Sequence, residues 1–292
     1  MSYEQATRLR SRIAGQKLLT GVGVRDALEA KLVGQAGFDF VWSSGFAISA
    51  SYGVPDASLI SMTQVLEATR SMAEVIDIPI VADCDTGFGN AINVIYAVKK
   101  FEDAGAAAIC MEDKRFPKDT SLLPGGRQEL VSVEEFSGKV QAAVRTRRNK
   151  DLVIIARTEA LIAGWGQEEA LKRAHHYEEA GADCILIHSK SKTPDEILEF
   201  ISRWEGKAPL VIVPTNYPSL TEADVRRAGK VKLVIYANQI LRAAIGAQQT
   251  ILAEMKKAGG IHTVDGAIPP VSRVFELQDV SGMKKDEQKY LR

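Results

Sequence analysis

Residues 78–90 read IPIVADCDTGFGN, and this stretch decides the fold. The apolar run around Ile80 and Val81 is typical of a buried strand, and it stops at two carboxylates, Asp83 and Asp85. A Thr-Gly-x-Gly-Asn turn follows, and a helical pattern begins near residue 91. A continuously apolar strand that leads into a helix indicates a parallel sheet covered on both faces.

The same strand–helix unit recurs along the whole chain. Apolar runs predict eight strands, and helical periodicity follows each of them; the strands are expected at 18–22, 38–43, 78–83, 106–111, 152–156, 182–187, 209–213 and 231–236. Glycines at 37, 105 and 181 are placed to end three of the helices. Eight such units in 292 residues predict an α/β protein with a (β/α)₈ barrel in one domain, residues 1–258. A doubly wound sheet is the alternative, but no glycine fingerprint follows the first strand.

Bulk composition excludes several classes of protein. Lys+Arg and Asp+Glu both total 37, so no cationic field for nucleic acid is expected. No apolar run approaches the roughly 20 residues of a membrane span, and the polar N-terminus does not resemble a secretory signal. Cys84, Cys110 and Cys184 each lie in an apolar run, which favours buried, reduced thiols in a cytoplasmic protein.

Asp83 and Asp85 suggest a metal site. Side chains two apart on a strand point the same way, and two like charges repel unless a cation or a proton lies between them. Oxygen ligands without His or Cys favour Mg²⁺ or Mn²⁺ over zinc. The alternative is that one Asp caps the next helix and the other is solvated.

Polar residues occur at nearly every predicted strand exit, where barrel enzymes place their chemistry. These residues are Ser43, Ser44, Asp83, Asp85, Glu112, Asp113, Arg157, Glu159, His188, Ser189, Thr215 and Asn238. Together they predict an anion-binding and metal-binding rim, in which Asp83, Asp85 and Glu112 hold Mg²⁺. Arg157 and His188 are suited to a phosphoryl or carboxylate oxygen.

Two loops add candidate groups. Residues 113–132 are long for a strand–helix connection and are interpreted as a lid that carries Lys118, Thr120 and Ser121; a solvated loop is the alternative. The turn at 44–46 offers backbone N–H groups for a carboxylate or enolate oxygen, although a glycine in a tight turn is common.

The motifs WSSGFAISASYGVPD, ADCDTGFGN, MEDKRFPKDTS, IARTEALIAGWG, ILIHSKSKTPDEI and VIVPTNYP resemble those of the phosphoenolpyruvate mutase/isocitrate lyase superfamily over nearly the whole chain. The resemblance implies a Mg²⁺-dependent barrel, with Mn²⁺ or Co²⁺ as possible substitutes, that acts on α-keto acids. The lid reads Lys118-Asp119-Thr120-Ser121. Because the mutases carry Asn at the position of Thr120, the chain resembles the phosphonopyruvate hydrolase branch most.

The resemblance also implies roles for individual residues. Asp83 would bind Mg²⁺, with Asp85 and Glu112 ordering its waters. The pyruvyl end of the substrate would lie against Trp42, Ser44, Gly45 and Phe46, and the phosphoryl group against Lys118, Thr120, Ser121, Arg157 and His188. Asp56, in YGVPD, matches an Asp of the mutase motif. The first strand–helix segment departs from the family pattern, because it lacks the His-Asn pair usual in phosphonate members.

These implications predict hydrolysis of the P–C bond of 3-phosphonopyruvate, an α-keto acid phosphonate. The alternatives are a phosphoenolpyruvate mutase, a lyase or decarboxylase of a related keto acid, and a non-catalytic binding protein. A lyase is disfavoured because the KKCGH-type loop with its Cys is absent. The resemblance further implies that the tail, residues 259–292, is helical and packs on a neighbouring subunit of a homotetramer built as a dimer of dimers.

Overall fold

The computed structural model describes residues 3–291 and confirms the barrel. Eight parallel strands close into one sheet in chain order, with β8 paired to β1. They are β1 (Leu19–Val24), β2 (Phe40–Ser43), β3 (Ile80–Asp83), β4 (Ala108–Glu112), β5 (Val153–Thr158), β6 (Cys184–Ile187), β7 (Leu210–Ile212) and β8 (Val231–Tyr236). Each lies within a few residues of its predicted position.

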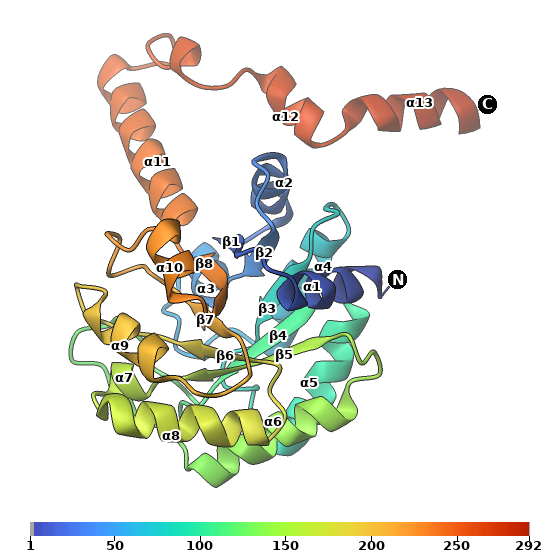
Figure 1. Cartoon of the computed structure of the whole chain (residues 1–292). Helices are drawn as coiled ribbons and strands as arrows, with labels where there is room; N and C mark the ends of the chain where they lie inside the picture. The colour runs from blue at the N-terminus through green and yellow to red at the C-terminus, as the bar shows by residue number, and fades with distance from the viewer. Residues whose placement is uncertain (1–2, 292) are drawn as a thin grey trace. The chain divides into compact units, whose positions relative to one another are not determined.

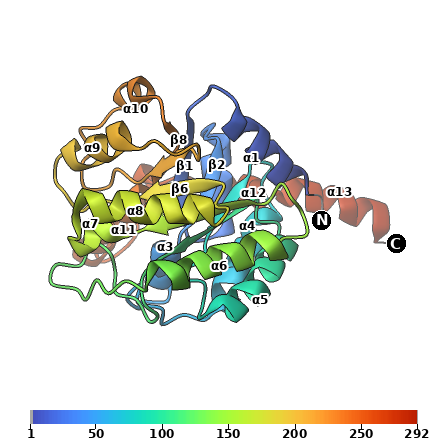
Figure 2. The same ribbon diagram turned by 60° about the horizontal axis from the view of Figure 1, so that its bottom comes forward.

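Helices surround the strands (Figure 1). They are α1 (Glu4–Ala14), α2 (Ala27–Gln35), α3 (Gly45–Ser51), α4 (Met62–Ala73), α5 (Ala91–Asp103), α6 (Val133–Thr146), α7 (Ala160–Ala163), α8 (Gly166–Glu179), α9 (Asp195–Arg203) and α10 (Glu222–Ala228). Figure 2 shows α5, α6 and α8 side by side on the outside of the sheet. The short helices α3 and α7 were not predicted, because four to seven residues are too few for helical periodicity to be visible.

The inside of the barrel is a packed core. Its N-terminal end is filled by Leu19 and Phe40 and is covered by Ala6 and Leu9 of α1. A glycine at position 21 makes room for the ring, since a Cβ there would lie 2.2 Å from Phe40. The core therefore closes the lower end of the barrel and leaves the strand exits free for polar groups.

Local sequence explains where helices begin and end. Ser61, Asn90 and Thr221 form capping boxes at the starts of α4, α5 and α10. The predicted terminating glycines at 37 and 105 have φ angles of 82° and 89°, and the one at 181 has 102°. The capping boxes fix where helices start, and the glycines turn α2, α5 and α8 back into the next strand.

One expectation about the opening stretch is wrong. β3 ends at Asp83, so Asp85 does not share a strand with it. Asp85 instead has a left-handed φ of 53°, at the start of the glycine turn. The direction of the Asp85 side chain is therefore set by the turn and not by the alternation of side chains along the strand.

The chain divides into two compact units, residues 1–239 and 240–292. The second unit contains nearly all of α11 (Gln239–Ala258), a 3₁₀ turn (Asp265–Ala267), α12 (Val271–Leu277) and α13 (Val280–Tyr290). The predicted division after residue 258, with a tail packed on a neighbouring subunit, stays a prediction. Within residues 3–291, no helix combines the length and apolar character needed to cross a lipid bilayer.

Candidate active site

A cavity of about 130 Å³ lies at the C-terminal ends of the strands. It collects most of the residues predicted from the sequence, in one place, and a small ligand would fill it. The lining residues are Trp42, Ser44, Phe46, Asp56, Asp83, Lys118, Thr120, Ser121, Leu122, Arg157, His188, Val213, Thr215, Ala237 and Asn238. Gly45, Asp85 and Glu112 lie beside this set rather than on the cavity wall.

Asp83 is fixed by backbone donors. Its Oδ2 accepts a hydrogen bond from the N–H of Gly45 at 3.1 Å, and its Oδ1 accepts one from the N–H of Asp85 at 3.2 Å. Burial raises the pKa of Asp83 to about 6. The N–H of Gly45, expected to face the substrate, is thus engaged by Asp83, and a Cβ at this glycine would lie 3.1 Å from the same oxygen.

The lid places an ammonium group among three carboxylates. Lys118 Nζ lies 3.2 Å from Asp56 Oδ2, 3.2 Å from Asp85 Oδ1 and 3.4 Å from Glu112 Oε1. Burial opposes the charge on Lys118, but these carboxylates outweigh it and hold its pKa well above the usual value. The hydroxyl of Ser58 joins the group by donating to Asp85 at 2.8 Å. The acids therefore converge, and the lid lies over them.

The acid cluster fits a hydrated hard cation. Among residues 3–291, no three His, Cys, Asp or Glu side chains converge closely enough to hold a metal by themselves. However, Asp85 Oδ1 and both carboxylate oxygens of Glu112 are buried and make ion pairs with Lys118 or Arg157 but no hydrogen bond. Mg²⁺ prefers oxygen ligands and keeps several waters. Carboxylate oxygens that make no hydrogen bond are suited to accept hydrogen bonds from such waters.

A second charged group lies on β5 and β6. Arg157 Nε lies 3.0 Å from Glu112 Oε2 and 2.6 Å from Glu159 Oε1. His188 Nδ1 lies 2.9 Å from Arg157 Nη2 and 3.1 Å from Glu159 Oε1. Burial lowers the pKa of His188, which favours the neutral imidazole. Since arginine only donates and an ionised carboxylate only accepts, Nδ1 satisfies one of these neighbours at a time.

The lid hydroxyls are held in defined positions. Thr120 Oγ1 donates to the carbonyl of Asp56 at 2.9 Å, and Ser121 Oγ donates to Glu159 Oε2 at 2.6 Å. Lys114 Nζ, only 1% exposed, lies 2.8 Å from Ser121 Oγ and 3.3 Å from Glu159 Oε2. The lid is therefore an ordered wall of the cavity rather than a solvated loop.

The sequence reasoning gave no individual role to Lys114, Ser58 or Glu159. Glu159 was recognised as a strand-exit residue, and Lys114 stands inside the quoted lid motif. No local pattern pointed to Ser58, because its role depends on Asp85, 27 residues away in the chain. As predicted, the three cysteines are free and buried, and none of them lies in the lid.

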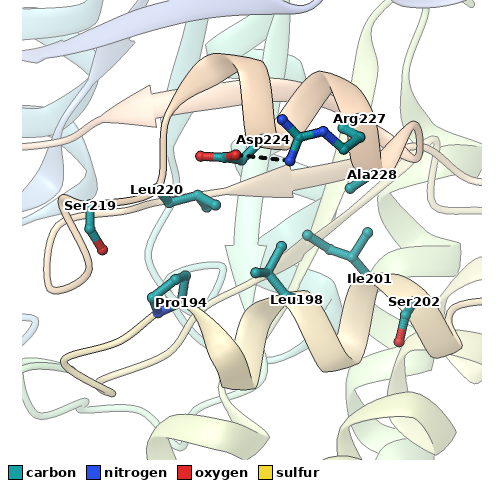
Figure 3. Close-up of a pocket in the computed structure, with 9 residues that line it drawn as sticks. All are labelled: Pro194, Leu198, Ile201, Ser202, Ser219, Leu220, Asp224, Arg227 and Ala228. Carbon is teal, nitrogen blue, oxygen red and sulfur yellow. Dashed lines mark hydrogen bonds and ion pairs between the residues drawn. The ribbon is translucent and has the colours of Figure 1, made fainter.

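A larger pocket of about 450 Å³ lies elsewhere, between α9 and α10 (Figure 3). Its wall is mainly apolar, including Leu198, Ile201 and Leu220. The charged pair on it, Arg227 and Asp224, is joined at 3.3 Å and exposed. Apart from this exposed pair, the wall of this pocket carries no titratable group, so the strand-exit cavity is the candidate active site.

Comparisons with known proteins agree with this geometry. Residues 9–256 match the family described as phosphoenolpyruvate phosphomutase. The chain is 55% identical over 292 residues to the phosphonopyruvate hydrolase of Variovorax sp. (strain Pal2), covering 100% of both chains. It is 42% identical to the phosphoenolpyruvate phosphomutase of Tetrahymena pyriformis, covering 99% of this chain and 96% of that one. A crystal structure of phosphonopyruvate hydrolase in complex with oxalate and Mg²⁺ superposes with a TM-score of 0.94, at 53% identity over 100% of each chain.

Proposed function

This chain belongs to the phosphoenolpyruvate phosphomutase family, and from that premise we propose that it hydrolyses 3-phosphonopyruvate to pyruvate and phosphate. The observation that carries the proposal is the position of Thr120. It stands on the cavity wall, in the lid string in which the chain departs from the mutase pattern. The 55% identity to a phosphonopyruvate hydrolase supports it.

The proposed reaction has two parts, cleavage of the P–C bond to give an enolate and transfer of the phosphoryl group to water. The P–C bond breaks and its electron pair stays on carbon as an enolate. Oxygen from water bonds to phosphorus as one of its O–H bonds breaks, and the proton released balances the proton that the enolate carbon takes up to give pyruvate. A loose phosphoryl transfer state needs positioning and cations more than covalent chemistry, and Arg157 and Lys118 bring such cations to the cavity.

Magnesium is the proposed cofactor, as in the hydrolase structure with oxalate and Mg²⁺. Asp83 would hold it, with Asp85 and Glu112 receiving hydrogen bonds from its waters. When bound, Mg²⁺ supplies positive charge beside the keto oxygen and carboxylate, where the enolate charge develops. Trp42, Ser44 and Phe46 would then enclose the pyruvyl end.

Thr120 is proposed to position the attacking water. Its hydroxyl hydrogen is donated to the carbonyl of Asp56, so its oxygen lone pairs remain available as acceptors. Asp56 offers Thr120 a peptide oxygen rather than a base, which favours orienting a water over nucleophilic attack by the hydroxyl. A mutase would instead return the phosphoryl group to the enolate oxygen.

Phosphorus NMR of the products tests the proposal. Purified enzyme with Mg²⁺ and phosphonopyruvate is expected to release phosphate. Thr120→Ala should slow release by about 10²-fold, the usual range for a positioned proton-handling group, whereas Thr120→Ser should retain most of it. Formation of phosphoenolpyruvate without phosphate by the unaltered enzyme would reject hydrolysis in favour of the mutase.

A homotetramer, arranged as a dimer of dimers, is part of the same proposal. Apolar side chains of the second unit, such as Val271, Phe275 and Leu252, are 66%, 51% and 65% exposed. Such surfaces are usually covered in an assembly. Light scattering on the purified chain checks this, and a particle of 31.8 kDa would contradict it. The free thiols also favour the cytoplasm as its location.

A further inference from the structure

Asp113 follows Glu112 at the end of β4, but its side chain does not line the cavity. It is fully buried, at 0% exposure, with donors on every side. Oδ1 accepts from the N–H of Glu159 at 2.8 Å. Oδ2 accepts from Tyr177 OH at 2.7 Å, Arg173 Nη1 at 3.0 Å and Thr158 Oγ1 at 3.2 Å. A buried carboxylate with this many donors is held in one orientation.

The same residue fixes the base of the lid. The carbonyl of Asp113 accepts from the N–H of Val131 at 2.9 Å, and Arg173 Nη1 donates to the carbonyl of Val131 at 3.1 Å. Between these contacts and the lid tip, Lys114 pairs with Leu130 in an antiparallel bridge. Both ends of the lid are therefore attached to one buried cluster, which consists of Asp113, Arg173 and Tyr177.

The cluster reaches the cavity through Glu159. The N–H of Glu159 donates a hydrogen bond to the carboxylate of Asp113. The carboxylate of Glu159 in turn accepts hydrogen bonds from Arg157 Nε and from Ser121 Oγ, both at 2.6 Å. The Nδ1 atom of His188 also lies 3.1 Å from this carboxylate. A shift of Asp113 would therefore move a cation, an imidazole and a lid hydroxyl together.

We propose that Asp113, Arg173 and Tyr177 are positioning residues that set Glu159 and the lid base for the phosphoryl half of the reaction. This rests on the proposed function. Asp83, the proposed metal ligand, has separate supports, because it is held by the N–H groups of Gly45 and Asp85. Loss of the cluster should impair turnover while leaving ligands of the metal half bound.

Two variants of graded severity test the cluster. Tyr177→Phe removes one donor but keeps the ring, which packs on Phe136 with centroids 4.7 Å apart. It should lower kcat by about 3- to 10-fold, the equivalent of one hydrogen bond. Asp113→Asn places an amide N–H₂ against existing donors and should lower kcat by about 10²-fold, as a small misplacement of reacting groups does.

Oxalate with Mg²⁺ is used to probe the pyruvyl and metal side of the site, around Asp83. Its inhibition constant should stay within about twofold in both variants, since lost contacts do not reach Asp83. Phe136→Leu is the matched control, because it disturbs the packing beside Tyr177 without removing a hydrogen bond. It should lower the thermal midpoint and leave kcat unchanged.

The outcomes separate a positioning role from a structural one. Unchanged kcat in folded Tyr177→Phe and Asp113→Asn, or equal losses of kcat and oxalate binding, would overturn the proposal. Hydrogen exchange of the Val131 amide, measured without substrate, should quicken in both variants. Because that readout does not use phosphonopyruvate, it tests the anchor even if the unaltered enzyme hydrolyses no phosphonate; unchanged exchange would also overturn it.

Discussion

Asp39, at the N-terminal end of the barrel, and Asp83 and Asp85, at its C-terminal end, are buried carboxylates whose pKa values shift in opposite directions. At the N-terminal end, Asp39 accepts hydrogen bonds from Arg12, from Lys17 at 2.8 Å and from the N–H of Thr20 at 2.9 Å. Burial opposes ionisation of Asp39, but these donors outweigh it and lower its pKa. At the C-terminal end, by contrast, burial raises the pKa of Asp83 and of Asp85.

The difference separates stability from function. Donors that match an acid make its charge favourable to folding, and the Asp39 contacts tie α1 to the closed end of the barrel. Acids whose burial is not offset by their neighbours, such as Asp83 with its raised pKa, cost free energy of folding in the isolated chain. They are useful only when a ligand supplies the missing partners.

The strongest way to break this comparison is to neutralise Asp83. Asp83→Asn should lower phosphate release by at least about 10³-fold, near 4 kcal/mol, because the proposed metal loses its charged ligand. The thermal midpoint measured in a chelator should be equal or higher, since the buried charge is removed. Retained turnover, or a marked loss of stability, would contradict the division.

Adding Mg²⁺ should stabilise the chain through Asp83 and so sharpen the comparison with Asp39. At 100 times its dissociation constant, Mg²⁺ should raise the free energy of unfolding by about 2.7 kcal/mol. Calorimetry with and without Mg²⁺ measures this. Asp83→Asn is the control, and an equal metal-dependent rise in that variant would show that the ion binds elsewhere.

Neutralising the acid at the other end should have the reverse effect. Asp39→Asn should lower the free energy of unfolding by about 1–3 kcal/mol, because buried donors lose their charged acceptor, while kcat of the folded enzyme stays unchanged. Asp103→Asn is the matched control: its side chain is 49% exposed and pairs with Arg148, so the loss should be below about 1 kcal/mol. A reduced kcat in Asp39→Asn would remove the distinction between the two ends.

The smallest effect is expected in acid. Because the folded pKa of Asp39 is lowered, its stabilisation is complete above the unfolded pKa of about 3.9 and disappears as the pH falls through the folded value. The gap in urea midpoint between the unaltered chain and Asp39→Asn should therefore be constant near neutrality and shrink below about pH 4. A gap that widens on acidification would have the wrong sign.

Much of the fold could be predicted because its signals are local. Apolar runs located the strands, and glycines such as Gly105 marked helix ends. The rim residues followed from the rule that parallel strands of a barrel exit at one end. Arg157 and His188 were brought to one cavity in this way, and Lys118 and Thr120 were expected from the long loop interpreted as a lid.

What could not be predicted depends on contacts between distant segments. The orientation of Asp85 comes from a left-handed turn rather than from strand alternation. Asp113 has the same rim position as its neighbour Glu112, yet it faces Arg173, 60 residues away, instead of the cavity. The sequence periodicity around Asp113 and around Arg173 does not predict that these two residues pair.

The bridge between Lys114 and Leu130 has a wider consequence. When both ends of a loop are fixed to the barrel, the residues between them can be replaced without changing how the rest of the chain folds. Residues 115–129 could then be rewritten to alter what happens to a captured phosphoryl group, while the barrel beneath stays as it is. A new reaction on this barrel then requires only a short replacement of the residues between Lys114 and Leu130.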